Sequence, residues 1–315
     1  MKLLIAGGAG CLGCNLTEHW AAAGHDILII DNFKTGNAEA VPVADNVSLM
    51  EGDISNFDHL DRLVAEFRPN VIINSAASYS DPLDWDSDIA TNIIGSKNLA
   101  LVADRYAIER IINFQTALVY GEPNQLPIPR HHQNAPSTSY GISKLAGEQY
   151  LLKSESRVLS LRLANITGPR LSIGPIPTFY QRLKEKKRCF CTKSKRDFLD
   201  MGDFLSFMDL ALLNNVSSGI YNLSSGEAHS VKEIYELVCE HFGMDASDVE
   251  EREVEEDDFE EICLDYSETE QEFSWRPEVS FTQQIKNQLA WYDKFGVSEI
   301  YSHLVTSHSG ADNEQ

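Results

Sequence analysis

The sequence predicts an α/β fold in which helices cover both faces of a parallel sheet. Short apolar runs alternate with helix-length segments through the first half of the 315-residue chain. Most residues of these runs are hydrophobic, as in strands buried on both faces. A glycine-rich turn joins the first run to the first helix-like segment. Strands and helices that alternate in this way form consecutive βαβ units.

The elements are expected in a regular order. Strands are expected at residues 3–6, 26–31, 47–53, 71–77, 110–116 and 157–165. Helices are expected at residues 14–23, 57–67, 88–106 and 139–154. Two of these helices stop at helix-breaking residues, Gly24 and Pro69. This order predicts a doubly wound parallel sheet.

The pattern changes after Gly168, where helices begin to dominate. We therefore expect a first domain over residues 1–168 and a smaller α/β domain over 169–303, with some segments interleaved. Residues 304–315 predict a disordered tail.

Three features of the second half can be placed from their composition. A short strand is expected at 219–225 and a terminal helix at 281–295. The strongly acidic run at 248–261 predicts a solvated loop or face.

The chain carries a formal charge of −22, within an otherwise ordinary globular composition of 43% hydrophobic and 23% charged residues. A surface this negative repels a polyphosphate backbone, so no nucleic-acid partner is expected. An anionic ligand would need a local cationic pocket, which gives weight to the few arginines near any candidate site.

Neither a membrane span nor an export signal is expected. No window of about 18 apolar residues exists, and the start MKLLIAGG lacks the features of a signal peptide. Cys11 and Cys14 form a CxxC pair, but they lie in the glycine-rich turn and no second pair has zinc-like spacing. We expect a cytoplasmic protein with six reduced cysteines and no metal.

Gly7, Gly10 and Gly13 have GxxGxxG spacing between the first strand and the first helix. Glycine there lets the backbone approach a pyrophosphate, which meets the free N–H groups of the helix N-terminus. Asp31 ends the second strand, where a carboxylate accepts hydrogen bonds from an adenosine ribose. This carboxylate would repel a 2′-phosphate, and only Lys34 follows it closely. The pattern predicts NAD rather than NADP as the cofactor.

Tyr140 and Lys144 lie four residues apart, on one face of the helix predicted at 139–154. An ammonium beside a phenol favours the phenolate, so the pKa of Tyr140 is expected below its usual value of about 10. Such a tyrosine exchanges a proton with a substrate hydroxyl near neutral pH. Thr116 ends the fifth strand, where its hydroxyl can share that proton. The three residues predict hydride chemistry at a substrate hydroxyl.

Nine motifs together resemble one superfamily, and they span about residues 1–300. They read GGAGCLG, DNF, GDI, NSAA, TNIIGS, QTALVYG, SYGISK, LRLANITGPR and RDFLDMGDF. The chain resembles the extended short-chain dehydrogenase/reductases, in particular nucleotide-sugar epimerases and dehydratases. With FQTALVYG and GPIPTFY it looks most like epimerase/dehydratase-like proteins of bacterial O-antigen clusters. The resemblance implies a Rossmann-type NAD-binding domain at 1–168 and a substrate-binding domain at 169–303.

The resemblance also implies residue roles. Tyr140 is expected to be the acid/base, Lys144 to bind the nicotinamide ribose and Thr116 to assist proton transfer. Thr116, Asn165 and Arg196 are expected to contact the substrate, the last two at its nucleotide diphosphate, because a guanidinium suits phosphate geometry. The expected NAD-binding residues are Gly7, Gly10, Cys11, Leu12, Gly13, Asp31, Asn32, Phe33, Thr35, Gly36, Asp53, Ile54, Ser75, Ala76, Ala77, Ser78, Asn92, Tyr140 and Lys144.

The two residues after Thr116 bear on the reaction. The resembling 4,6-dehydratases read TDEVYG here, and their Asp and Glu drive elimination. Ala117 and Leu118 cannot move protons. Elimination is therefore not expected, and we expect C4 epimerisation of a nucleotide-linked hexose or hexuronic acid. The resemblance implies a place in bacterial surface-polysaccharide synthesis. The alternatives are a 4-keto-sugar reductase and, from another class, a non-catalytic dinucleotide-binding sensor or scaffold.

Two segments depart from the family pattern. A phosphate-binding arginine is common where this chain has the acidic stretch 255–258, and Arg252 is the nearest replacement. His131 and His132 replace an acidic turn. They are expected on a solvent-exposed loop, with a role in reading an acidic sugar as the lesser alternative.

The resemblance also implies a homodimer. The helices expected at 88–106 and 139–154 would pair across a two-fold axis into a four-helix bundle. Their apolar residues include Ile93, Leu99, Leu101, Leu145, Leu151 and Leu152.

Overall fold

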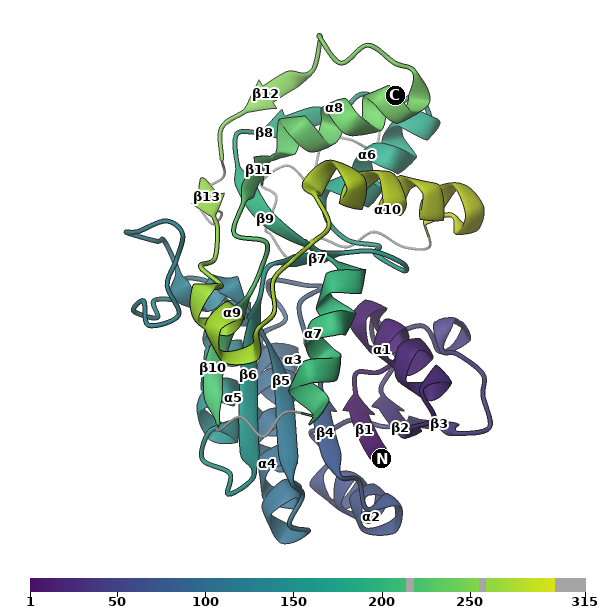
Figure 1. Cartoon of the computed structure of the whole chain (residues 1–315), viewed down its shortest axis with the longest axis vertical. Coiled ribbons are helices and arrows are strands. Elements are labelled where there is room, and N and C mark those ends of the chain that lie inside the picture. The colour runs from purple at the N-terminus through teal and green to yellow at the C-terminus, as the bar shows by residue number, and fades with distance from the viewer. Residues whose placement is uncertain (214–217, 255–258, 298–315) are drawn as a thin grey trace.

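The centre of the structure, a computed structural model, is a sheet of seven parallel strands (Figure 1). The structure describes residues 1–213, 218–254 and 259–297. In the sheet, the strand order is β10-β6-β5-β4-β1-β2-β3. The strands are β1 (Lys2–Ala6), β2 (Asp26–Asp31), β3 (Val47–Glu51), β4 (Val71–Asn74), β5 (Arg110–Thr116), β6 (Arg157–Leu163) and β10 (Gly219–Leu223).

This order confirms the predicted doubly wound topology. The chain builds β1, β2 and β3 outward from the middle, then returns to the other side of β1 for β4, β5, β6 and β10. The direction of winding reverses between β1 and β4, and ligands of such sheets bind in the crevice at that point. The seventh strand comes from the second half of the chain, so residues 219–223 complete the first domain's sheet.

Helices cover both faces of the sheet, as the alternation of strands and helices predicted. Along β1, Leu3 and Ile5 pack toward α1 (Cys11–Ala22) and α7 (Met201–Leu213). Their neighbours Leu4 and Ala6 pack toward α2 (Phe57–Phe67), α4 (Ser96–Arg105) and α5 (Ser139–Leu151). Successive side chains of a strand point to opposite faces, so β1 contributes to the hydrophobic clusters on both faces of the sheet.

Some boundaries differ from the prediction. The strands expected at 47–53, 71–77 and 157–165 end at Glu51, Asn74 and Leu163, because the chain turns there into the loops above the sheet. The first helix begins at Cys11 instead of residue 14, directly after the glycine turn.

The helix expected at 88–106 is a continuous run of three parts. It consists of α3 (Trp85–Asp88), a π-helical turn η2 (Ile89–Gly95) and α4. Single π-turns inside α-helices often mark functional positions. Two short 3-10 turns, η1 (Ala38–Ala40) and η3 (Ala117–Tyr120), follow β2 and β5.

The upper part of Figure 1 holds a second layer with its own apolar cluster. Its helices are α6 (Pro175–Lys184), α8 (Val231–Phe242) and α10 (Phe281–Phe295), while α9 (Ser267–Phe273) lies beside β10. Its strands are β7 (Asn165–Thr167), β8 (Phe190–Thr192), β9 (Lys195–Asp200), β11 (Ala228–Ser230), β12 (Glu250–Arg252) and β13 (Glu261–Ile262). No helix of the described residues is long and apolar enough to cross a bilayer.

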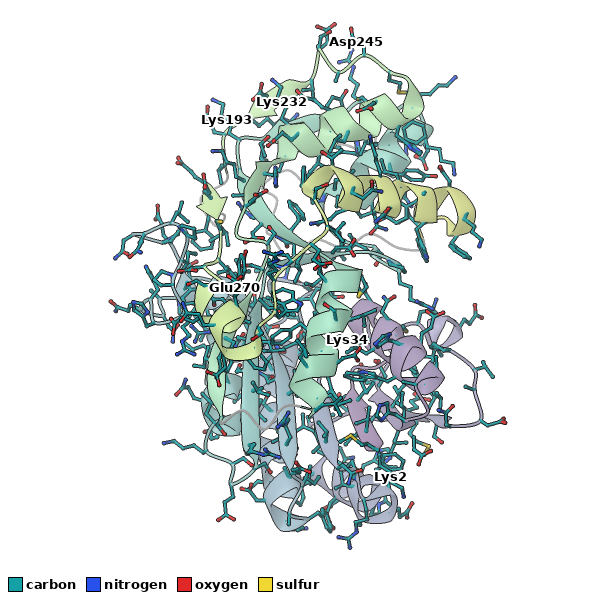
Figure 2. All side chains as sticks on the ribbon, viewed as in Figure 1. Lys2, Lys34, Lys193, Lys232, Asp245 and Glu270 are labelled. Atoms are coloured by element: carbon teal, nitrogen blue, oxygen red, sulfur yellow. The ribbon has the colours of Figure 1, made fainter. Side chains whose placement is uncertain are left out.

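The acidic run at 248–261 agrees with the predicted solvated face, because its residues 250–253 and 260 are exposed. Its ends form β12, paired with β8, and β13, paired with β9. Two of its carboxylates form ion pairs with lysines that Figure 2 labels. Lys232 Nζ lies 2.6 Å from Glu251 Oε1, and Lys193 pairs with Glu253. The acidic stretch 255–258 and the tail 304–315 lie outside the described residues.

Candidate active site

A cleft of about 1440 Å³ opens at the carboxyl ends of the central strands and extends to α6 and β9. Most of the residues predicted from sequence line it, including the three expected to be catalytic. Gly13, Phe33 and Asn92 do not line it. The cleft exceeds the roughly 300–1,000 Å³ of a usual small-molecule site, and this leaves room for two ligands.

The glycine-rich turn leaves the N-terminus of α1 open to the cleft. Gly7 has a φ of +74°, and a Cβ there would lie 2.6 Å from the Ala76 Cα atom. A Cβ on Gly13 would lie 2.5 Å from the Gly8 Cα atom. A Cβ on Gly10 would meet only the Gly7 oxygen, at 3.4 Å. The first and third glycines are thus needed for packing, and the second leaves a surface that fits the pyrophosphate of a dinucleotide.

Gly8 is a further requirement that the sequence argument missed. A Cβ on Gly8 would lie 2.6 Å from the Ile29 Cγ2 atom on β2. The GG pair at the end of β1 therefore combines a left-handed turn with close packing against the next strand.

Asp31 lies at the end of β2 with its carboxylate held in place. It accepts hydrogen bonds from the backbone N–H groups of Ala9 and Phe33, both at 2.9 Å. Burial raises the pKa of Asp31, although these two bonds oppose the shift. Lys34 is bound to Asp84, with 2.7 Å between Nζ and Oδ2. A fixed carboxylate and a neutralised lysine suit an unphosphorylated ribose.

Asp53 and Asn32 meet beside Asp31. The Asn32 amide donates to Asp53 Oδ2 at 2.9 Å, and Ser55 N donates to Oδ1 at 2.8 Å. Burial raises the pKa of Asp53, but the hydrogen bonds from Ser55 and Asn32 outweigh it and hold the pKa below its usual range. The ionised carboxylate therefore fixes the Asn32 amide where both residues line the cleft.

Asn92 does not line the cleft but supports it from the helix, as the resemblance implies. Its amide oxygen accepts from Ser78 N at 3.0 Å, and its amide nitrogen donates to the Ser143 hydroxyl at 3.0 Å. The π-helical turn η2 carries this side chain. Asn92 thereby ties the loop after β4, which lines the cleft, to α5.

Thr116, Tyr140 and Lys144 all line the cleft. Thr116 ends β5, and its hydroxyl accepts from Leu118 N at 3.2 Å, so it caps η3. The Lys144 ammonium donates to the Phe114 carbonyl at 2.6 Å. Ala117 and Leu118 also line the cleft and bring no ionisable group to it.

The structure changes the predicted pKa of Tyr140. Burial raises the pKa of this phenol, with further contributions from Tyr79 and Asp88. The sequence argument weighed only the ammonium one turn away, whereas removal from water acts more strongly in this structure. Burial also lowers the pKa of Lys144 to about 8, against an opposing effect of Glu148.

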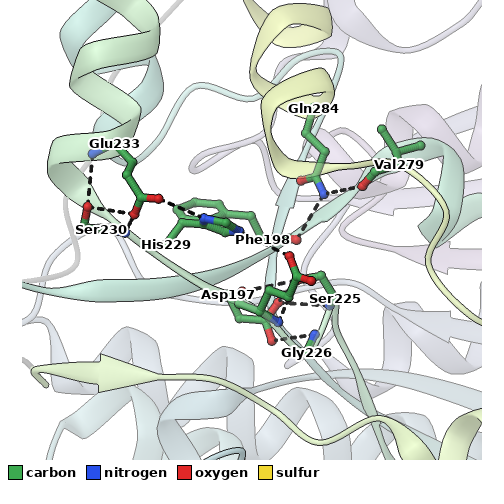
Figure 3. Close-up of polar contacts among 10 residues, drawn as sticks. Asp197, Phe198, Ser225, Gly226, His229, Ser230, Glu233, Val279 and Gln284 are labelled. Atoms are coloured by element: carbon green, nitrogen blue, oxygen red, sulfur yellow. Dashed lines mark hydrogen bonds and ion pairs between the residues drawn. The ribbon is translucent and has the colours of Figure 1, made fainter.

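Asn165 and Arg196 lie together on paired strands, β7 and β9, and both line the cleft. Asn165 Nδ2 donates to the Asp197 carbonyl at 3.1 Å, and Arg196 Nη1 donates to the Phe259 carbonyl at 2.8 Å. The buried Asp197 carboxylate accepts the Ser225 hydroxyl at 2.7 Å and Ser225 N at 3.0 Å (Figure 3). These bonds fix β9 and so the base of the Arg196 side chain.

Other residues of the cleft were not found from sequence. Tyr79 lines it next to the glycine turn, and Arg182 lines it from α6. Arg182 Nε donates to the Arg188 carbonyl at 2.7 Å, and no described carboxylate forms an ion pair with Arg182. The sequence holds no signal for these two residues, because neither belongs to a motif and the helix at 175–184 was not among the expected elements.

Arg252 and the two histidines lie away from the cleft. The Arg252 guanidinium stacks 3.8 Å from the centre of the Phe190 ring and bonds to Glu250 at 2.8 Å. His131 is exposed and lies 3.8 Å from a Glu268 oxygen. None of these three side chains lines the cleft, although Phe190, on which Arg252 stacks, does. The phosphate-binding role of Arg252 stays a prediction. The exposed-loop prediction holds for His131, whereas His132 is half-buried against Tyr120.

Comparison with known proteins agrees with this geometry. Residues 3–224 match the NAD dependent epimerase/dehydratase family. The chain is 50% identical to WbmG of Bordetella bronchiseptica in complex with NAD, with a TM-score of 0.92 over 97% of this chain and 98% of that one. Another structure of WbmG holds NAD and UDP.

Two further relatives extend the comparison. WbmH of the same organism, in complex with NAD+, is 36% identical, with a TM-score of 0.89 over 94% of this chain and 99% of that one. The UDP-glucose 4-epimerase of Corynebacterium glutamicum is 30% identical over 77% of this chain and 81% of that protein. The chain therefore belongs to the NAD dependent epimerase/dehydratase family, and NAD is its cofactor.

Proposed function

We propose that the protein interconverts C4 epimers of a uridine-diphosphate hexose or hexuronic acid through a 4-keto intermediate. The observation that carries the proposal is a cleft that combines Thr116, Tyr140 and Lys144 with Ala117 and Leu118. The first three residues supply proton handling beside the cofactor. The last two bring no acid or base for elimination. The UDP bound to WbmG supports uridine as the nucleoside.

NAD, when bound, accepts the C4 hydride and returns it. Tyr140 takes the proton of the C4 hydroxyl, and Thr116, which lines the same cleft, is proposed to share it. Lys144 holds the nicotinamide ribose, and its positive charge favours the phenolate of Tyr140. When the hydride returns to the opposite face of the sugar, Tyr140 gives the proton back. The reaction consumes no reducing equivalent.

The epimerase needs the sugar to turn while its nucleotide stays bound. Asn165 and Arg196 are proposed to hold the diphosphate, because a guanidinium can donate two parallel hydrogen bonds to phosphate oxygens. Arg182 adds a second cation to that side of the cleft. The protein as a whole is strongly negative, so these local cations oppose a general repulsion of the substrate.

The chain is also proposed to be a homodimer and to act in surface-polysaccharide synthesis. The dimer rests on exposed apolar side chains along α4 and α5. The pathway rests on the resemblance to proteins of bacterial O-antigen clusters.

The test is incubation with UDP-hexoses and UDP-hexuronic acids, followed by NMR of the C4 proton coupling. We expect two C4 epimers to interconvert without consumption of added NADH. Stoichiometric oxidation of NADH would instead indicate a 4-keto reductase, and a 4-keto-6-deoxy product would indicate a dehydratase. No turnover of any nucleotide sugar by the NAD-loaded protein would favour the sensor or scaffold alternative.

A further inference from the structure

Lys34 is an isolated cation beside the cofactor half of the cleft. It is the only Lys or Arg between Lys2 and Arg62, and it lies in the loop that follows β2. Lys34 lines the cleft, and its ammonium reaches the segment that leads into α3. Lys34 Nζ lies 2.7 Å from Asp84 Oδ2 and also donates to the Ser87 hydroxyl. The ion pair therefore joins two loops that are far apart in the sequence.

The two loops follow strands on opposite sides of β1. Both β2 and β4 pair with β1, and the glycine turn comes directly after β1. Residues 34–37 line the cleft from the β2 side, and residues 75–80 line it from the β4 side. A contact between these loops spans the end of β1, where a dinucleotide binds in such sheets. The ion pair thus connects the two walls of the cofactor half.

Each wall is fixed near the cleft by a contact of its own. Asn37 N donates to the Ala9 carbonyl at 3.0 Å, which ties the β2 loop to the glycine turn. Ser78 N donates to the amide oxygen of Asn92 at 3.0 Å, which ties the β4 loop to η2. Lys34 and Asp84 lie outside these ties, so their contact can break while the walls stay in place.

Asp84 lies in a segment that apolar packing does not hold. Its neighbours Leu83 and Trp85 are 74% and 62% exposed. The Asp84 carboxylate caps α3 by accepting a hydrogen bond from Ser87 N at 3.1 Å, and its other oxygen pairs with Lys34. The ion pair therefore holds this segment against the loop after β2.

The contact is of a kind that opens readily. The Lys34 side chain is 51% exposed and that of Asp84 is 33% exposed. Ion pairs at such exposure are weak, and salt screens them. A weak contact between the two walls delays the exit of a ligand without preventing its exchange.

We propose that Lys34 and Asp84 form a clasp across the cofactor half of the cleft and slow the release of NAD. The inference rests on the proposed function for its purpose, because an epimerase must keep the reduced cofactor while the sugar turns. Its physical content concerns cofactor release alone. Its test therefore needs no sugar.

The experiment measures how fast the holoprotein releases NAD. Protein loaded with radiolabelled NAD is mixed with an excess of unlabelled NAD, and the bound label is followed by rapid filtration. Asp84→Asn removes the charge and keeps a side chain that caps α3. Its NAD should leave about three- to fivefold faster, which is what an exposed ion pair can supply. Lys232→Met breaks the exposed pair with Glu251 in the second layer and is the control, with release at the wild-type rate.

A double variant shows whether Lys34 and Asp84 act through each other. Lys34→Met should also speed release, and Lys34→Met with Asp84→Asn should be no faster than the faster single variant, because either change breaks the pair. Salt should speed release from the wild type more than from Asp84→Asn, since only the wild type has the pair to screen.

Two results would overturn the inference. One is release at the wild-type rate from Asp84→Asn, and the other is a double variant in which the effects of the single changes multiply. Failure of the wild-type protein to epimerise any sugar would contradict the proposed function, yet would leave these release rates unaffected.

Discussion

Tyr140 and Lys144 show how burial opposes the chemistry expected of them. Removal from water raises the pKa of the phenol and lowers that of the ammonium, so it favours the neutral form of both. The reaction needs the opposite charges. Neighbouring charges must therefore offset the effect of burial, as the charge of Glu148 does in part for the pKa of Lys144.

The pH dependence of cofactor binding follows from Lys144. Its pKa is lowered to about 8, so the ammonium is present below that pH and is lost above it. NAD affinity, measured by calorimetry between neutral and alkaline pH, should weaken as the pH rises through about 8. The Lys144→Met variant should bind weakly with no such dependence. An affinity that stays level through this range in the wild-type protein would contradict the role of Lys144.

Asp31 offers a second test at the scale of one residue. Asp31→Ala removes the carboxylate that is placed to accept ribose hydroxyls, and hydrogen bonds to a charged group contribute about 1.5–3 kcal/mol. NAD affinity should fall by roughly 10- to 100-fold. Asp26→Ala, at the exposed far end of the same strand, is the control and should bind as the wild type does. Equal affinities for the two variants would exclude the proposed contact.

At the scale of elements, the turn between β1 and α1 has two roles. It fixes the strand-to-helix connection by close packing at Gly7 and Gly13, and it leaves open space over Gly10. Both roles depend on the absence of side chains at these glycines.

Gly7→Ala should separate close packing from backbone strain. The new Cβ would lie 2.6 Å from Ala76 at a positive φ. Gly24→Ala is a matched control, because Gly24 also has a positive φ but nothing lies within 4 Å of its added Cβ. The control should lose about 1–2 kcal/mol, and Gly7→Ala about 1–3 kcal/mol more through overpacking. Urea unfolding measures both, and equal losses would show that contact with Ala76 is unimportant.

The elements could be predicted where the local pattern was strong. The limits of β2 and β5 agree with the predicted strands, although β5 also buries the polar side chains of Asn113 and Gln115. The π-turn at 89–95 could not be predicted, since it depends on packing against α5. The strand pairing of the acidic run could not be predicted either, because its partner strands β8 and β9 are far away in sequence.

The residues of the candidate site could likewise be predicted where a local sequence pattern marked them. Residues tied to the ends of strands and to the glycine turn were found from their spacing. Arg182 was missed because nothing in the sequence shows which face of α6 meets the cleft. The direction of the Tyr140 pKa was wrong because burial is a property of the fold.

At the scale of the whole molecule, the apolar residues of α4 and α5 divide into two groups. Leu99 and Leu151, expected at a dimer interface, are buried within the subunit. Of the six residues named from the sequence, Leu101 is the one exposed. The other exposed apolar side chains of this region are Ile89, Ile94, Ile142 and Tyr150. Apolar residues lie on more than one face of these helices. The sequence does not show which face packs within the subunit and which is left for the interface.

A dimer through this face is expected at micromolar concentration. Light scattering should give about twice the 35.2 kDa of one chain. Leu101→Glu with Ile142→Glu should give a monomer, because two charges would be buried unpaired. Met50→Glu, an exposed apolar residue on β3, is the control and should remain a dimer. A wild-type monomer, or a double variant that stays dimeric, would contradict this interface.

The central claim is that one hydride leaves C4 and returns to the same carbon from the other face. The measurement that tests it most directly uses a UDP-hexose carrying deuterium at C4, the NAD-loaded protein and unlabelled water. The account predicts that the epimer formed retains the deuterium at C4, and that Tyr140→Phe abolishes its formation while NAD stays bound. Deuterium lost to the solvent, or near-normal turnover by the Tyr140→Phe variant, would contradict it.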